Sequence, residues 1–180
     1  RRKMSAAAEA RIRAATLKDA ETIYALIRRN SDQLVPRSLG SVVESIDRFF
    51  VAEAEGETVG CASYQIHPEI GEAEAAAVEI VSLAVKSIFR RRGIGRLLVK
   101  AAMERIAALR PREIVVLTFA PEFFGSLGFQ EIPKNKIMHK LYTGCINCTK
   151  HGNPYTCPEI AMEYSGNKKE EGKCDLSYSS

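Results

Sequence analysis

The densest group of chemically distinctive residues is the stretch FRRRGIGR, residues 89–96, which packs four arginines and two glycines into eight positions. The stretch follows an apolar run, VEIVSLAV at 78–85, and precedes apolar residues at helical spacing. The first turn of a helix has unpaired N–H groups and partial positive charge, which attract phosphate. Glycine lets an anion approach those groups, and arginine adds charge and donors. The pattern predicts a diphosphate-binding turn formed by Arg90, Arg91, Arg92, Gly93, Ile94, Gly95 and Arg96.

The same stretch admits other interpretations. A glycine pair before a helix can be turn chemistry alone, and an arginine run can be a solvated face. A nucleic-acid or localisation patch is a further alternative, but only Phe89 supplies an aromatic ring nearby. The Gly-Lys-Ser/Thr ending of a nucleoside-triphosphate loop is missing. The apolar strand before the turn and the amphipathic helix after it favour the anion site.

Composition narrows the class of protein. A chain of 180 residues is long enough for one domain with a sizeable core. The net charge of +4 is too small to indicate a nucleic-acid partner by itself. No apolar run reaches the roughly 18 residues that cross a bilayer, and residues 1–10 lack the apolar centre of a signal peptide. We therefore expect a cytoplasmic protein with no membrane or nucleic-acid partner.

The first half of the chain reads as two helices and a hairpin. Thr16 with Asp19, and Ser41 with Glu44, have the spacing of helix capping boxes. The turn at 55–57 joins two runs with strand character. The expected elements are a strand at 11–16, helices at 17–29 and 41–48, and strands at 49–55 and 58–67.

The second half alternates strands and helices. The run at 78–85 is apolar and β-branched, as in a central buried strand. A helix begins at Gly93 and ends before Pro111, and a short helix ends at Gly128. Strands are expected at 113–119, 129–132 and 136–142. This order predicts a single sheet domain of the α/β or α+β class.

Residues 90–95, RRRGIG, resemble the Q/R-x-x-G-x-G/A signature of the GNAT acetyltransferases, and PEFFGSLGF at 121–129 resembles the family's closing F-[YF]-x-x-x-GF segment. The resemblance covers about residues 10 to 142. It implies the GNAT fold, a mixed and mostly antiparallel central sheet flanked by helices. It also implies an acyltransferase that uses acetyl-CoA as co-substrate. The turn would then bind the pyrophosphate, and Leu83, Ala84 and Val85 would pair with the pantetheine arm and polarise the thioester.

Acetyl transfer to an amine requires a base for the amine proton and a donor for the leaving thiolate. Glu79 lies on the apolar strand where GNAT enzymes often place the base, although a strand-end glutamate pointing to solvent is the alternative. Many members have a tyrosine acid at the position of Phe124, so that role is vacant here. Thr118 is a possible polar substitute, and a plain strand-end threonine is the alternative.

Within the family, the chain most resembles the short stand-alone bacterial N-acetylglutamate synthases, through LVPRS-x-x-x-V-x-x-x-I-D-x-F at 34–49 and VVLTF at 115–119. This likeness implies acetylation of the α-amino group of L-glutamate in arginine biosynthesis, by direct attack in a ternary complex. Arg37 would hold a substrate carboxylate, with the backbone of Val35 and with Ser82 nearby. A homodimer is expected. The alternatives are a different amine (another amino acid, a polyamine or a protein amine) and a non-catalytic acyl-CoA sensor.

Two features depart from the larger synthases. Those enzymes have an Arg-Ser pair after VLT that contacts glutamate, whereas this chain has Phe119-Ala120-Pro121. The fused amino-acid-kinase domain is also missing from this sequence. The short synthases share both features, so glutamate remains the expected acceptor.

Cysteines at 145, 148 and 157 form a C-x2-C-x8-C pattern that could ligate zinc together with His151. His151 follows Cys148 by only three residues and there is no second C-x2-C pair, so redox chemistry or buried thiols are favoured over Zn²⁺. Cys145, Cys148 and Cys157 stay candidates only, and no metal is expected. The segment resembles the end of the short synthases, which implies packing on the domain. The expected organisation is a tail at 1–10, a GNAT domain at 11–142, a cysteine-containing extension at 143–164 and a flexible tail at 165–180.

Overall fold

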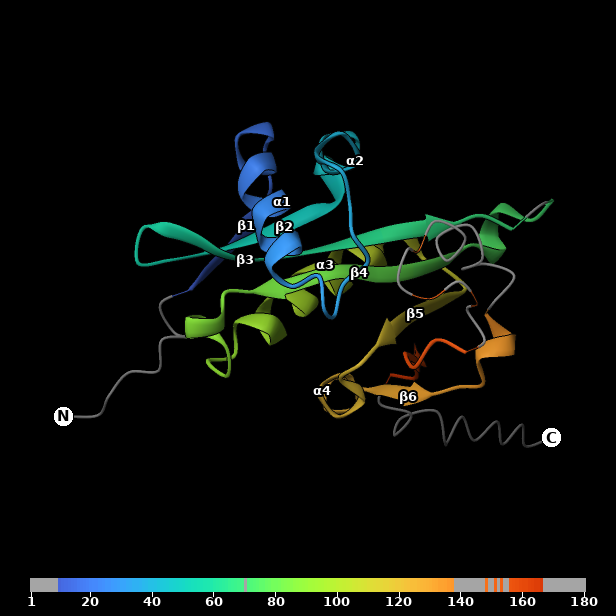
Figure 1. The fold of residues 1–180 in the computed structure, drawn as a ribbon. Helices are drawn as coiled ribbons and strands as arrows, with labels where there is room; N and C mark the ends of the chain where they lie inside the picture. The colour runs from blue at the N-terminus through green and yellow to red at the C-terminus, as the bar shows by residue number, and fades with distance from the viewer. Residues whose placement is uncertain are drawn as a thin grey trace, which may run out of the picture.

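The computed structural model describes residues 10–69, 71–137, 148, 151, 153 and 156–166. Its centre is a seven-stranded sheet with the order β1-β2-β3-β4-β5-β7-β6 (Figure 1). All neighbouring strands are antiparallel except β4 and β5, which are parallel. The strands are β1 Arg11–Ala14, β2 Phe49–Ala54, β3 Glu57–His67, β4 Ala77–Val85, β5 Glu113–Thr118, β6 Phe129–Glu131 and β7 Ile160–Tyr164.

Helices cover both faces of this sheet because the strands alternate their apolar side chains. On one face, Val51 and Cys61 pack under α1 and α2, and on the other face Ala62 packs under α3 (Figure 1). Burial raises the pKa of the Cys61 thiol to about 12, so it behaves as a small core residue. The α-helices are α1 Ala20–Arg29, α2 Leu39–Glu44, α3 Ile94–Leu109 and α4 Pro121–Gly125, with single 3-10 turns at Leu17–Asp19, Ile46–Arg48, Ala73–Ala75, Ser87–Phe89 and Lys134–Lys136.

The middle of the sheet opens where β4 and β5 separate. The two strands pair only from Ala77–Glu79 to Glu113–Val115. Beyond Glu79, β4 remains paired with β3 along one edge, and β5 remains paired with β7. Ser82 has a φ of 56°, and the β3–β4 register shifts between Cys61 and Ser63. The result is a bulged β4 whose second half has a free edge facing the opening.

Most elements expected from the sequence are confirmed, including the hairpin, the strand at 78–85 and the helix after Gly93. The Thr16–Asp19 capping box is present, with the Thr16 amide donating to Asp19 Oδ2 at 2.7 Å. The predicted start of the second helix is wrong. Ser38 caps it, because its extended backbone leaves its hydroxyl to accept from the Ser41 amide at 3.1 Å. The helix ends at Glu44, and residues 46–48 form a separate turn.

The C-terminal part of the sheet differs from the expectation. Strand β7, which the sequence pattern did not predict, lies between β5 and β6 and pairs with both. Of the strand expected at 136–142, Lys136 ends a 3-10 turn and residues 138–142 lie outside the described residues. In the part of the chain that the structure describes, no helix is long and apolar enough to cross a membrane.

Candidate active site

A cavity of about 440 Å³ lies at the arginine–glycine turn, where the end of β4 meets the start of α3. Gly93 caps α3 with a φ of 82°, a left-handed conformation that other residues adopt at a cost. Arg91, two residues earlier, also has a positive φ, at 58°. The first-turn N–H groups of a helix have no partner within that helix, so this concave turn can accept an anion. Gly93, Gly95 and Ile94, which the sequence analysis placed in a diphosphate-binding turn, line the cavity.

The four arginines of the turn have different surroundings. Arg90 and Arg91 line the cavity, and Arg90 donates to the Val85 carbonyl at 3.2 Å and to Asn30 Oδ1. Arg96 also lines it and donates to Ser126 Oγ at 2.9 Å. Arg92 is not among the lining residues. Its guanidinium lies 5.1 Å from the centroid of the Phe89 ring, and its Nη1 is 3.8 Å from Glu55 Oε1.

The free edge of β4 leads from this turn toward the centre of the sheet. Leu83, Ala84 and Val85 line the cavity, while their other edge pairs with β3. Backbone groups on an unpaired strand edge are available to an extended ligand. A helix N-terminus followed by a free strand edge fits a ligand with a diphosphate at one end and an amide-containing arm, which is the chemistry of CoA.

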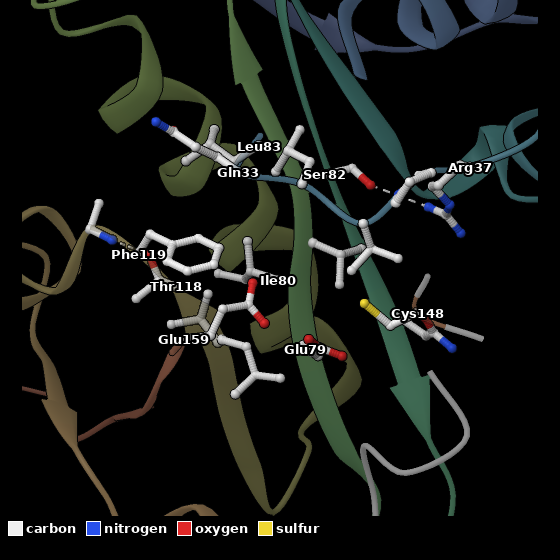
Figure 2. Close-up of a pocket in the computed structure, with 18 of the residues that line it drawn as sticks. Gln33, Arg37, Glu79, Ile80, Ser82, Leu83, Thr118, Phe119, Cys148 and Glu159 are labelled. Carbon is white, nitrogen blue, oxygen red and sulfur yellow. Dashed lines mark hydrogen bonds between the residues drawn. The ribbon is translucent and has the colours of Figure 1, made fainter. Parts of the chain in front are cut away.

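A second cavity, of about 650 Å³, adjoins the first one, and Figure 2 shows residues that line it. The two share Gln33, Leu34, Leu83 and Phe123. Five separate parts of the chain enclose it: the segment at 33–41, Gln65 of β3, strand β4, the end of β5 with the residues that follow, and residues near the C-terminal end of the described chain. A group bound along β4 would therefore present its end to this second cavity.

Glu79 lies on β4 with its carboxylate in the second cavity (Figure 2). Its Oε2 is 2.8 Å from Nε2 of His67 on β3. The His67 side chain is 4% exposed and that of Glu79 is 14% exposed, so the pair is shielded from water without being closed off. The contact holds the Glu79 carboxylate in position within the cavity, where it can receive a proton from an amine.

Arg37 lies at the other end of the cavity, near Ser82 (Figure 2). Its guanidinium donates to Ser82 Oγ at 3.4 Å and to Ser41 Oγ at 3.3 Å, and it stacks 5.6 Å from the centroid of the Phe49 ring. Among the described residues, no carboxylate lies within ion-pair distance of it. Burial lowers the pKa of Arg37 from its usual value, and nearby Arg48 lowers it further. A partly buried cation without a counter-ion favours an anionic ligand.

Thr118 and Phe124 lie on the β5 side of the cavity. Thr118 Oγ1 accepts from the Ala120 amide at 2.9 Å, which leaves the hydroxyl hydrogen free to donate elsewhere. Phe124 is 4% exposed and packs edge-on against Phe129 in the core. Thr118 is thus a hydroxyl donor in this region. Val35, by contrast, is 45% exposed at the rim of the cavity.

The cysteine segment contributes to the same cavity, which the sequence pattern did not indicate. Cys148, His151 and Cys157 line it, whereas Cys145 lies outside the described residues. Within the described ranges, no group of three or more His, Cys, Asp or Glu side chains is placed to hold a metal ion. Burial raises the pKa of the Cys157 thiol.

Three residues of the site escaped the sequence analysis. His67 and Asn30 carried no local signal, because each acts on a residue distant in sequence. Glu159 lines the second cavity and follows Cys157 by two residues in CPEIAM, residues 157–162, where the cysteine pattern and not the carboxylate supported the prediction.

Residues 45–131 match the acetyltransferase (GNAT) domain. An uncharacterized N-acetyltransferase of Chlorobaculum tepidum is 35% identical over 158 residues, which cover 87% of this chain and 96% of that protein. An amino-acid acetyltransferase of Mycobacterium tuberculosis is 28% identical over 136 residues, covering 73% of this chain and 74% of the relative. An amino-acid acetyltransferase of Aeromonas salmonicida is 33% identical over 138 residues. These residues cover 72% of this chain but only 30% of the relative.

Solved structures show the same fold. A Mycobacterium tuberculosis protein in complex with CoA superimposes with a TM-score of 0.70 at 23% identity, covering 85% of this chain and 97% of that one. N-acetylglutamate synthase from Neisseria gonorrhoeae, complexed with coenzyme A and N-acetyl-glutamate, gives 0.68 at 22% identity, covering 86% of this chain and 34% of that one.

Fold and site together define an acyl-CoA-dependent transferase. The chain belongs to the GNAT family of acetyltransferases, and acetyl-CoA is its acyl donor. The predicted fold class and acyltransferase activity are confirmed, so the acyl-CoA sensor gives way to an enzyme.

Proposed function

We propose that the protein is an N-acetylglutamate synthase, which transfers the acetyl group of acetyl-CoA to the α-amino group of L-glutamate in arginine biosynthesis. The observation that carries the proposal is the unpaired Arg37 guanidinium in the cavity that also holds Glu79. A carboxylate bound by Arg37 places the rest of an amino acid between Ser82 and Glu79. The names of the Mycobacterium and Neisseria relatives support an amino-acid acceptor.

The binding of acetyl-CoA follows from the first cavity. The diphosphate lies at the turn formed by Arg90, Arg91 and the amides from Gly93 onward, and the pantetheine arm lies along Leu83 to Val85. The acetyl group then reaches the junction of the two cavities, and backbone N–H groups of β4 polarise its carbonyl.

The reaction is a direct attack in a ternary complex. Glu79 accepts a proton from the amine, whose lone pair forms a C–N bond with the carbonyl carbon. The C–S bond then breaks, and the thiolate leaves with the electron pair and takes up the second proton that the nitrogen loses as the amide forms. Thr118 donates a hydrogen bond to that sulfur, in place of the tyrosine that Phe124 replaces. The products are N-acetylglutamate and CoA.

The charge of the cavity favours a second candidate acceptor. Among the described lining residues, Arg37 is the only arginine or lysine, whereas Glu79 and Glu159 are both acidic. Glutamate carries two carboxylates, and an amino acid with a single carboxylate would match one guanidinium better. The same protein could then acetylate a neutral amino acid such as glutamine.

The test is thiol release from acetyl-CoA with each common amino acid offered in turn. Highest kcat/KM with glutamate supports the synthase, and highest kcat/KM with glutamine supports the second candidate. Arg37→Ala should raise the KM for the acceptor about 10- to 100-fold, because a charge-assisted contact is lost. The KM for acetyl-CoA should stay within about twofold. An unchanged acceptor KM would show that Arg37 does not bind the carboxylate.

A further inference from the structure

Glu159 is a second carboxylate in the acceptor cavity. It directly precedes β7, whose first residue, Ile160, pairs with Thr118 at the end of β5. This register brings Glu159 to the opening beside β4. Figure 2 shows the Glu159 and Glu79 carboxylates in the same cavity, one from each side of the sheet's opening, with Arg37 farther along.

The Glu159 carboxylate has weak partners. Cys157 Sγ lies 3.6 Å from its Oε2, and a thiol is a poor donor. In the described part of the chain it forms no ion pair. Burial raises its pKa above the usual value and the charge of Glu79 adds to the rise, whereas the hydrogen bond from Cys157 and the charges of Lys134 and His151 offset part of it. Lys134 is directed elsewhere, because its Nζ donates to the Cys157 carbonyl.

Two carboxylates in one shielded cavity repel each other until a cation enters between them. The acceptor supplies that cation, because an α-amino group is mostly protonated at neutral pH. We propose that Glu159 is an acceptor-binding residue, which holds the amino group of the substrate against Glu79 while Arg37 holds its carboxylate. This inference rests on the proposed transfer to an amino acid, and it holds for glutamate or for a neutral amino acid alike.

The two carboxylates then have different tasks. Glu79, whose orientation is set by His67, takes one proton from the ammonium nitrogen. Glu159 accepts a hydrogen bond from an N–H that remains and keeps the nitrogen in place as its lone pair turns to the thioester. Loss of Glu159 should therefore impair binding of the amine more than the chemical step.

The experiment compares an acceptor with its analogue that lacks the amino group. Calorimetry measures the binding of glutamate and of glutarate to the protein saturated with CoA. Glu159→Gln should weaken glutamate binding about 10- to 100-fold and change glutarate binding less than about threefold, because only glutamate has the group that Glu159 contacts. Glu163→Gln is the matched control on β7, since Glu163 pairs with Lys136 on the surface.

Steady-state kinetics provide an independent test of the role of Glu159. In Glu159→Gln the KM for the amine should rise by the same factor, with kcat and the KM for acetyl-CoA within about threefold of the wild type. Equal weakening of glutamate and glutarate would overturn the proposal, as it would mean that Glu159 only shapes the cavity. Unchanged binding of both, or a loss confined to kcat, would also overturn it.

Two further outcomes are covered. If Glu159→Gln has a clearly lower Tm than the wild type, Glu159→Asp replaces it in the binding experiment, because it keeps the charge on a shorter side chain. It should weaken glutamate binding severalfold and spare glutarate, and any other result counts against the proposal. If wild type acetylates another amino acid and not glutamate, the glutamate assignment fails alone, and that amino acid is compared with its own analogue. Binding of no amine at all would overturn both.

Discussion

The arginine–glycine turn occupies eight consecutive residues, 89–96, whereas the second cavity is enclosed by five separate segments. In the first region, residues adjacent in the chain determine the backbone geometry, because the glycines, the arginines and the start of the helix follow one another directly. In the second region, Arg37, Glu79 and Glu159 approach one another only because β4 and β5 diverge and β7 pairs with β5. In the proposed binding mode, a local motif therefore binds the acetyl-CoA common to the family, and residues brought together by the tertiary structure bind the acceptor.

The largest effect should come from Glu79 in the acceptor region. Glu79→Gln removes the proton acceptor, so we expect kcat to fall about 10²- to 10⁴-fold. The KM for acetyl-CoA should be unchanged, because the cofactor turn is untouched. Steady-state kinetics check this, with Glu72→Gln in the loop before β4 as control. Turnover within a few-fold of wild type would show that Glu79 is not the base.

An intermediate effect should separate two adjacent arginines of the turn. Arg91 lines the first cavity, whereas Arg92, which stacks on Phe89, is not among its lining residues. Arg91→Ala should raise the KM for acetyl-CoA about 10-fold, since a charge-assisted contact to the diphosphate is lost. Arg92→Ala should change it less than about twofold. Equal effects of the two variants would mean that the turn acts through net charge alone.

The smallest effect on catalysis should come from an ion pair outside both regions. Arg13 donates to both Asp19 oxygens at 2.8 Å, and this contact lowers the pKa of Asp19 to about 2. The pair secures the start of α1, which leads into the segment bearing Arg37. Asp19→Asn should cost about 2 kcal/mol of unfolding free energy at neutral pH, with kinetic constants near wild type.

The contribution of the Arg13–Asp19 pair to the free energy of unfolding should depend on pH. A carboxyl with a depressed pKa stabilises the fold fully above its unfolded value, and this stabilisation is lost as pH falls toward about 2. Urea unfolding from pH 6 to about pH 2 should therefore show the wild type converging on Asp19→Asn. Asp32→Asn, an exposed change just after α1, is the control. A constant difference between wild type and Asp19→Asn across this range would contradict the linkage.

Several parts of the site were visible in the sequence because they depend on short-range rules. Gly93 and the arginines are adjacent in the chain, and Glu79 lies on a run whose apolar, β-branched character marks a buried strand. The cap of α2 was misassigned because Ser38 and Ser41 both fit the composition of a cap, and only the backbone conformation distinguishes them. Strand β7 was missed because Ile160–Tyr164 follows a cysteine-containing segment without clear periodicity.

By itself the sequence predicted the fold class and an anion-binding turn, from hydrophobic period and helix-terminus chemistry, and its resemblance to the GNAT enzymes implied Glu79 as the base. Only the tertiary structure decided that His67 contacts Glu79, that Arg92 is not among the residues lining the first cavity, and that Glu159 lines the second. The physical reason is that strand pairing and side-chain direction depend on contacts between residues far apart in the chain. Such contacts have no fixed spacing in the sequence from which they could be predicted.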